Sequence, residues 1–148
     1  MTTQVFQNGV LIETIDDREF EQKQADVSKE VSRIRDGYLA GGYSHDFGEP
    51  HGVKALQTRP DDRTNWLTSQ AAYSAAIAAG AGNMSGAVFR TEDNVTIGMT
   101  YMEGLTVLLA MAAWGQSVMA RSWDIKDEIE SATDETELAA VDIESGWP

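Results

Sequence analysis

The segment from Met102 to Ser131, MEGLTVLLAMAAWGQSVMARSWDIKDEIES, decides the fold of this chain. Its apolar residues recur at helical spacings and divide between two faces. One face carries Leu105, Leu108, Leu109 and Ala112, and the other carries Val107, Met111, Trp114, Val118, Ile125 and Ile129. Because both faces need burial, we expect this long helix to be the spine on which the rest of the chain packs.

Part of this segment, from Gly104 to Ala120, contains no charged residue. A helix that spans a bilayer needs about 20 predominantly apolar residues. The uncharged run is shorter than that, follows Glu103, and includes Gly115, Gln116 and Ser117. We therefore expect a buried core helix rather than a membrane span.

A second helix is expected before the spine, from Pro60 to about Ala79. Proline suits the first helical position because its missing N–H is not needed there, and Asp61 and Asp62 favour the positive end of the helix dipole. Gly80 and Gly82 should stop the helix. Its buried residues are expected to be Trp66, Tyr73 and Ile77.

Shorter elements surround these two helices. The residues from Ser85 to Thr91 and from Val95 to Met99 read as a β-hairpin, since Asp and Asn between them favour a turn. Tyr43 to Val53 is expected to be short strand or extended chain. After the spine, Asp134 and Glu137 resemble a capping box that opens a short helix.

The first third of the chain is expected to begin with a strand or hairpin, because Gln4 to Ile15 alternate weakly around Asn8-Gly9. A charged helix should follow from Asp17 to Tyr38. Its seam repeats at spacings of four and three residues, through Phe20, Gln24, Val27, Val31, Ile34 and Tyr38. This seam either packs the helix on its own domain or forms a short self-associating coiled coil, for which three heptads are the lower limit.

The composition of the 148 residues favours a soluble, acidic domain with a formal net charge of -13. Such a balance argues against binding to nucleic acid or to an anionic membrane, because phosphate contacts need clustered Lys and Arg. Cysteine is absent, which excludes disulfides, thiolate metal sites and Cys nucleophiles. The start of the chain has no basic patch followed by an apolar core, so no signal peptide is expected.

One cluster has the residue types of a metal site: His45, Asp46, Glu49 and His51. Imidazole and carboxylate groups together can ligate zinc or another divalent ion. The spacing fits no specific motif, and Gly48 and Pro50 make the segment read as a turn, so exposed polar turn residues are the favoured interpretation. Paired carboxylates elsewhere fall at expected helix starts, turns and charged faces. We therefore expect no catalytic, metal-binding or cofactor-binding residue.

Another polar set lies at the expected junctions between elements: Arg59, Asp62, Arg63, Asn65 and Arg90. At such positions side chains can bond exposed backbone groups and one another. We expect a structural network that links the second helix to the hairpin, with ligand recognition as the minority interpretation.

Five short motifs stand out in the second half of the chain: Gln57-Thr58-Arg59, Asp62-Arg63-Thr64-Asn65-Trp66, Arg90-Thr91-Glu92-Asp93-Asn94, Ser122-Trp123-Asp124-Ile125-Lys126 and Gly146-Trp147-Pro148. Together they resemble a family of small domains of unknown function that bacteriophages and prophages encode in their tail-fibre regions. The resemblance covers about residues 48–148. It implies a phage tail or tail-fibre-associated protein with a variable N-terminal part, and it carries over no catalytic residue.

These observations predict an α+β fold that is mostly α. A helical core of two long helices, a short terminal helix and a small β-hairpin would form a domain over residues 48–148. The strand and heptad helix of residues 1–47 would lie apart from it and serve oligomerisation and attachment. Trp147 is expected to dock on the core, where Trp66, Trp114 and Trp123 are mostly buried.

The expected function is that of a structural subunit of a phage tail, fibre or baseplate, located in the virion after synthesis in the host cytoplasm. Its partners would be other tail proteins and further copies of itself, with a trimer favoured by the resemblance. Attachment anchors are expected among Phe6, Phe20, Tyr38, Tyr43 and Phe47. The alternatives are a fibre-assembly chaperone that leaves before the virion is complete and, more distantly, a metal-dependent hydrolase that uses the His45 cluster.

Overall fold

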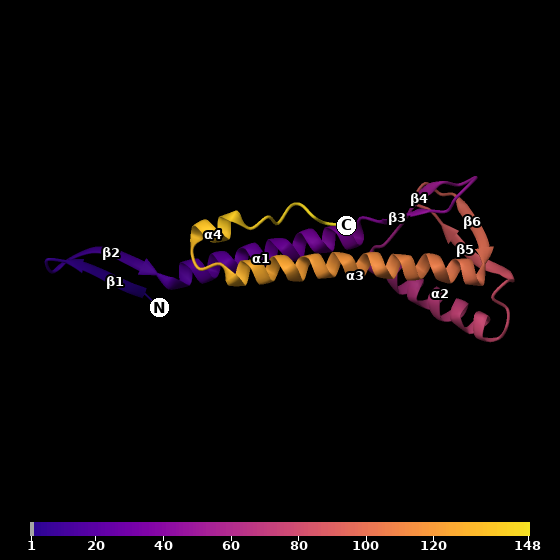
Figure 1. Cartoon of the computed structure of the whole chain (residues 1–148), viewed down its shortest axis with the longest axis horizontal. Helices are drawn as coiled ribbons and strands as arrows, with labels where there is room; N and C mark the ends of the chain where they lie inside the picture. Colours follow the sequence, from indigo (N-terminus) through magenta and orange to yellow (C-terminus); the bar gives the residue numbers. More distant parts are fainter. Residues whose placement is uncertain (1) are drawn as a thin grey trace. The chain divides into compact units, whose positions relative to one another are not determined.

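The computed structural model describes residues 2–148, without the side chains of Thr2 and residues 13–18. The predicted mostly helical α+β class is confirmed: long helices alternate with small antiparallel two-stranded sheets (Figure 1). The helices are α1 (Asp17–Ala40), α2 (Pro60–Ala78), α3 (Tyr101–Ser131) and α4 (Glu135–Ala140). The strands are β1 (Thr2–Gln7), β2 (Val10–Asp16), β3 (Tyr43–Asp46), β4 (Val53–Leu56), β5 (Ser85–Arg90) and β6 (Thr96–Thr100).

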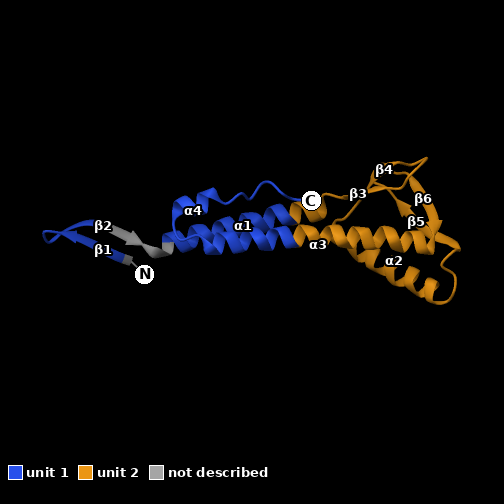
Figure 2. Ribbon diagram, viewed as in Figure 1, with its two compact units in different colours: residues 1–35, 120–147 blue, residues 36–119, 148 orange. Residues whose placement is uncertain are grey.

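The chain divides into two compact units, and α1 and α3 each contribute residues to both units (Figure 2). Unit 1 combines the chain up to Arg35 with residues 120–147, and unit 2 combines residues 36–119 with residue 148. The division expected from the sequence, between residues 47 and 48, therefore does not coincide with the compact units. The physical reason is that α1 packs with the C-terminal part of α3 rather than standing apart from it.

Unit 2 is built on a core between α2, α3 and the hairpins β3–β4 and β5–β6. Its buried residues are Leu56, Tyr73, Ala87, Phe89, Val107, Leu108 and Met111. Phe89 is fully buried at the centre, with the Trp66 ring stacked on it at a centroid distance of 5.4 Å. The predicted burial of Tyr73 is confirmed, while Trp66 and Ile77 are only partly buried.

A glycine sets the distance between α3 and the β5–β6 hairpin. A Cβ atom added at the buried Gly104 would lie 2.4 Å from the Cβ of Ala87, which is far inside van der Waals contact. Only a residue without a side chain lets the first turn of α3 lie this close to β5. The N-terminal part of α3 is thereby held against the sheet, with Val107 and Leu108 in the core.

Unit 1 packs the first part of α1 against the end of α3, α4 and the following tail. Its buried residues are Val31, Ile125, Ile129, Ala132 and Leu138, and Phe20, Val27, Val141, Ile143 and Trp147 pack against them. Gln24 donates from Nε2 to the main-chain oxygens of Ile129 (2.9 Å) and Ala132 (3.2 Å), and so caps the end of α3.

The heptad seam of α1 is consequently an internal surface of unit 1 over most of its length. Phe20, Val27 and Val31 pack in the cluster just described, and Val31 is fully buried. Ile34 is partly buried and Tyr38 is exposed. The structure thus corresponds to the first of the two interpretations of the seam, packing within the same chain, because α3 supplies Ile125 and Ile129 as a partner surface.

Two expectations about the spine differ from the structure. Trp123 is 53% exposed instead of buried, and Leu109, expected on a buried face, is 52% exposed. Each unit covers its part of α3 mainly on one side, so apolar residues on the opposite side remain at the surface. In the part of the chain that the structure describes, no helix has the length and apolar character required to cross a membrane.

Candidate functional site

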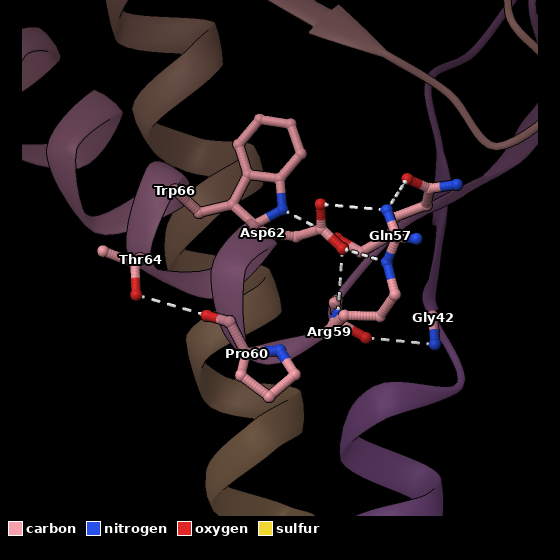
Figure 3. Close-up of polar contacts among 8 residues, drawn as sticks. Gly42, Gln57, Arg59, Pro60, Asp62, Thr64 and Trp66 are labelled. Carbon is pink, nitrogen blue, oxygen red and sulfur yellow. Dashed lines mark hydrogen bonds and ion pairs between the residues drawn. The ribbon is translucent and has the colours of Figure 1, made fainter.

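The start of α2 is fixed by a compact set of polar contacts (Figure 3). The carboxylate of Asp62 accepts hydrogen bonds from the backbone N–H of Arg59 (3.1 Å) and from its guanidinium Nε (2.8 Å). Arg59 also donates to the side-chain oxygen of Gln57 at 2.7 Å, and the indole N–H of Trp66 donates to the Gln57 carbonyl at 2.8 Å. These bonds hold the first turn of α2 and the orientation of the Trp66 ring.

Two charged side chains of this set, Arg59 and Asp62, shift each other's pKa. The hydrogen bond from Arg59 holds the pKa of the Asp62 carboxyl below its usual value, because the guanidinium stabilises the carboxylate. The same contact raises the pKa of Arg59. Since Arg59 is exposed, the pair acts as a helix cap on the surface rather than as a reactive centre.

The structure assembles the predicted polar network only in part. Arg59 and Asp62 meet as described, but Arg63 and Asn65 are exposed on α2. Arg90 donates to Thr96 Oγ1 at 2.7 Å, within its own hairpin. The hairpin β5–β6 is instead joined to α2 by the backbone N–H of Val88, which donates to the Tyr73 hydroxyl at 3.3 Å, and to the hairpin β3–β4 by Lys54, which pairs with Asp93 at 2.5 Å.

Beside the start of α2 lies an apolar groove of about 490 Å³, which we call the α2–α3 groove. Its apolar lining includes Leu39, Trp66, Leu67, Met111, Trp114 and Met119. The groove follows one side of each helix, since its α2 residues are 60, 63, 64, 66, 67 and 70 and its α3 residues are 108, 111, 112, 114, 115 and 119. Gly115 leaves the α3 wall low: an added Cβ atom would lie 3.9 Å from Leu39 Cδ2.

The charge distribution around this groove is unusual for an acidic chain. Among the described residues that line it, Arg63 is the one with a charged side chain. No Asp, Glu, Lys or Arg occurs from Thr64 to Phe89 or from Gly104 to Ala120, so the remainder of both helix faces is neutral. The uncharged run in α3 can be read from the sequence. The groove cannot, because its lining comes from three helices that are separated in the sequence.

The four residues of the candidate metal cluster lie around a second cavity, of about 430 Å³, next to β6 and the start of α3. Two of them are engaged locally: Asp46 Oδ1 accepts the backbone N–H of Gly48 at 2.9 Å, and His45 Nδ1 lies 3.2 Å from the Tyr43 hydroxyl. Glu49 and His51 complete the turn. Among the described residues, no three His, Asp or Glu side chains form a group that could hold a metal ion.

The hairpin β1–β2 presents apolar side chains outside both core clusters. Its turn is made by Asn8 and Gly9, which both have positive φ angles (52° and 79°), as the sequence predicts. Among its described side chains, the large apolar ones that are exposed are those of Phe6, Val10, Leu11 and Ile12. Phe6 lies opposite Leu11 in the strand register, so these two side chains share one face of the hairpin.

The other expected anchors are distributed differently. Tyr43 and Phe47 pack against the core of unit 2, and Phe20 packs in unit 1. Tyr38, like Phe6, remains exposed.

The comparisons with known proteins identify one family. A model described as a domain of unknown function (DUF4376) matches residues 21–145. The chain belongs to this family. The DUF4376 domain therefore includes most of α1, which the resemblance had left outside by starting at residue 48, and it begins after the hairpin β1–β2. Neither curated proteins nor solved structures gave a match.

Proposed function

We propose that this DUF4376 protein is a structural component of a bacteriophage tail, fibre or baseplate, and that it attaches to another tail protein through the hairpin β1–β2. The tail assignment is supported by the short motifs that resemble proteins encoded in tail-fibre regions. The mode of action is supported by the apolar surfaces of the described residues, which suit attachment to proteins.

The observation that carries the attachment role is the exposure of four large apolar residues on one small hairpin: Phe6, Val10, Leu11 and Ile12. An isolated two-stranded hairpin is marginally stable in water. It gains stability when another protein covers its apolar side chains or adds a strand to one of its edges. The hairpin also precedes the residues that match the family, as expected for an attachment element specific to one tail.

The alternative is a chaperone that binds fibre proteins during assembly and is absent from the finished particle. The exposed apolar side chains of the hairpin β1–β2 would also suit a transient complex with a fibre protein. Mass spectrometry of purified virions separates these functions: the structural role requires the protein in the particle at a reproducible ratio to other tail proteins. Its absence from virions, together with its presence in complexes with fibre protein in infected cells, would establish the chaperone instead.

The attachment surface can be tested on the same particles. The double substitution Phe6→Ser and Leu11→Ser removes the shared apolar face. We expect incorporation of the protein into virions to fall by roughly tenfold or more, since buried aromatic anchors dominate such contacts. Gln7→Ser, at an exposed position of the same hairpin, is the matched control and should incorporate normally. Equal incorporation of both variants would place the attachment surface elsewhere.

A further inference from the structure

We propose that Asn8 is a site of spontaneous covalent modification, and that the hairpin β1–β2 controls the reaction by opening and closing. When the hairpin opens, the backbone nitrogen of Gly9 attacks the side-chain amide of Asn8, and the asparagine becomes aspartate or isoaspartate. The proposal concerns the chemistry of the turn and does not depend on the tail assignment. It rests on the two turn residues, on their exposure and on a comparison with a second turn of the same chain.

The reaction needs only the protein and water. The Gly9 nitrogen forms a bond to Asn8 Cγ while the bond from Cγ to Nδ2 breaks, and Nδ2 leaves as ammonia with the proton of the Gly9 amide. The product of this step is a succinimide ring. Water then adds to one of its carbonyl carbons and breaks the bond from that carbon to the Gly9 nitrogen. Opening at Cγ gives aspartate, opening at the main-chain carbonyl gives isoaspartate, and no atom is oxidised or reduced.

The turn leaves the attacking nitrogen accessible. Asn8 and Gly9 are both exposed, and Gly9 has no side chain that could hinder the approach to its nitrogen. The strand register closes at the pair Gln7 and Val10. The N–H of Gly9 therefore belongs to the turn and is not one of the donors of the strand ladder.

The closed turn holds the reacting atoms apart. Asn8 and Gly9 have positive φ angles of 52° and 79°, which is the arrangement of a type I′ turn. In such a turn ψ of the first residue is about +30°, which directs the Gly9 nitrogen away from the side chain of Asn8. Ring closure requires rotation about this bond until the nitrogen lies beside Asn8 Cβ, so the strands must first separate at the turn. The rate is then proportional to the fraction of molecules in which the hairpin is open.

The hairpin can open without unfolding the rest of the protein. None of its described side chains belongs to either core cluster, and an isolated two-stranded hairpin is marginally stable in water. Elements with few buried apolar contacts open locally at a much lower free energy than elements of a core. Asn8 is therefore available for the reaction in molecules whose two cores remain folded.

A second asparagine, Asn94, provides a comparison within the same chain. It lies in the turn between β5 and β6, is exposed, and has a φ of 64°, the same left-handed conformation as Asn8. The next residue is Val95, whose branched side chain shields its nitrogen and whose N–H donates to Thr91 Oγ1 at 2.9 Å. The hairpin β5–β6 is also anchored in the core of unit 2 by the fully buried Phe89. Asn94 is thus protected both by its neighbour and by packing.

The reaction alters both the shape and the charge of the hairpin. Isoaspartate adds one methylene group to the main chain of the turn, and the length of this turn fixes the pairing of Gln7 with Val10. Each product also places a carboxylate in the segment from Thr2 to Ile12, which contains no charged side chain. The isoaspartate form therefore no longer closes the hairpin in its original register.

The first test follows every asparagine of the purified full-length protein by peptide mass spectrometry during incubation at mildly alkaline pH. The asparagines are Asn8, Asn65, Asn83 and Asn94. We expect conversion at Asn8 to be at least about tenfold faster than at Asn94, because the hairpin β1–β2 opens more often. The product should be heavier by about 1 Da, should contain isoaspartate and, in water enriched in heavy oxygen, should carry the label. A rate at Asn8 no greater than at the other asparagines would overturn the proposal.

The second test locks the hairpin with a disulfide. Phe6 and Leu11 are register partners, and Cα atoms of antiparallel partners lie about 4.5–5.5 Å apart, within the range of about 4.4–6.8 Å that a disulfide requires. Because the chain has no cysteine, the double variant Phe6→Cys and Leu11→Cys contains no other thiols. Its oxidised monomer should convert Asn8 at least about tenfold more slowly than the same variant after reduction, with equal rates at Asn94. Equal rates at Asn8 in the two forms would overturn the control of the reaction by hairpin opening.

The third test examines the modified hairpin itself. The isoaspartate form, separated from the unmodified protein by ion exchange and reversed-phase chromatography, should show faster hydrogen exchange over residues 2–12 and unchanged exchange in both cores. Asn8→Asp is the matched control, because it adds the carboxylate without lengthening the main chain and Asp-Gly also favours a type I′ turn. This variant should retain the exchange rates of the unmodified hairpin. Equal exchange in the isoaspartate form and in the unmodified protein would overturn the predicted loss of register.

Discussion

At the scale of single residues, one ion pair joins the two hairpins of unit 2. Lys54 on β4 lies 2.5 Å from Asp93, in the turn between β5 and β6, and the backbone N–H of Glu92 donates to the Ala55 carbonyl at 2.8 Å. The hydrogen bond from Lys54, supported by one from Thr91, lowers the pKa of the Asp93 carboxyl. The Lys54–Asp93 ion pair and the Glu92–Ala55 hydrogen bond thus both join the hairpin β3–β4 to the hairpin β5–β6.

This pKa shift predicts how stability depends on pH. Because the pKa of Asp93 is lower in the folded protein, its contribution is complete above the ordinary Asp pKa of 3.8 and is lost as the pH falls through the folded value. Asp93→Asn should lower the melting temperature slightly at neutral pH and should reduce the loss of stability as the pH falls below about 4. Asp127→Asn, at an exposed position of α3, is the control. An acid dependence identical to that of the unmodified protein would show that the ion pair does not contribute.

At the scale of elements, α4 and the tail after it are held by side chains from several parts of unit 1. Asp134 Oδ1 accepts the backbone N–H of Glu137 at 2.8 Å, and Glu137 Oε2 accepts that of Thr133 at 2.7 Å, which is a reciprocal cap at the start of α4. The Arg121 guanidinium donates to the carbonyls of Asp142 (3.1 Å) and Ser145 (3.0 Å). These bonds fix the tail so that Trp147 can pack against the cluster of unit 1.

Replacing Trp147 should therefore destabilise the protein. The ring is half-buried against the cluster and its N–H donates to the Ile143 carbonyl at 3.0 Å, so Trp147→Ala should cost about 2 kcal/mol, less than a fully enclosed ring. Trp123→Ala is the matched control: Trp123 is 53% exposed, and its loss should cost under about 1 kcal/mol. Denaturant unfolding followed by circular dichroism gives both values, and equal effects of the two substitutions would contradict docking of Trp147.

At the scale of the whole molecule, the chain uses sequence-distant segments to complete each unit. Unit 1 needs α1 from the start of the chain and α3, α4 and the tail from its end. The segment that matches the family, residues 21–145, contains the buried residues of both clusters. None of the described side chains of the hairpin β1–β2 belongs to either cluster, so the hairpin is separable from the cores in a way that α1 is not.

Two deletions should distinguish these roles. Removing residues 1–16 takes away the hairpin and should leave the melting temperature within a few degrees of the original. Removing residues 1–47 also takes away Val31 and its neighbours on α1, and should expose Ile125 and Ile129 of α3. We expect hydrogen exchange to show lost protection over residues 120–147 in the second deletion only. Unchanged protection there would mean that the end of α3, α4 and the tail fold without α1.

The sequence by itself determined the elements and most of their ends. Asn8-Gly9 makes the predicted turn, Pro60 begins α2, Gly80 with a φ of +84° follows its end, and Asp134 caps α4. These features can be predicted from the sequence because a turn or a cap depends on residues only a few positions apart. The separation of Arg59 and Asp62 by three residues likewise predicts their contact.

Only the tertiary structure decided what each apolar surface contacts. The spacing of the α1 seam is the same whether its partner is another copy or the chain's own α3, and the choice depends on Ile125 and Ile129, about a hundred residues away. The exposure of Trp123 and the presence of the α2–α3 groove likewise depend on chain segments that are distant in the sequence. Periodicity shows that a helix has an apolar face, but whether that face is buried depends on chain segments whose positions no local pattern records.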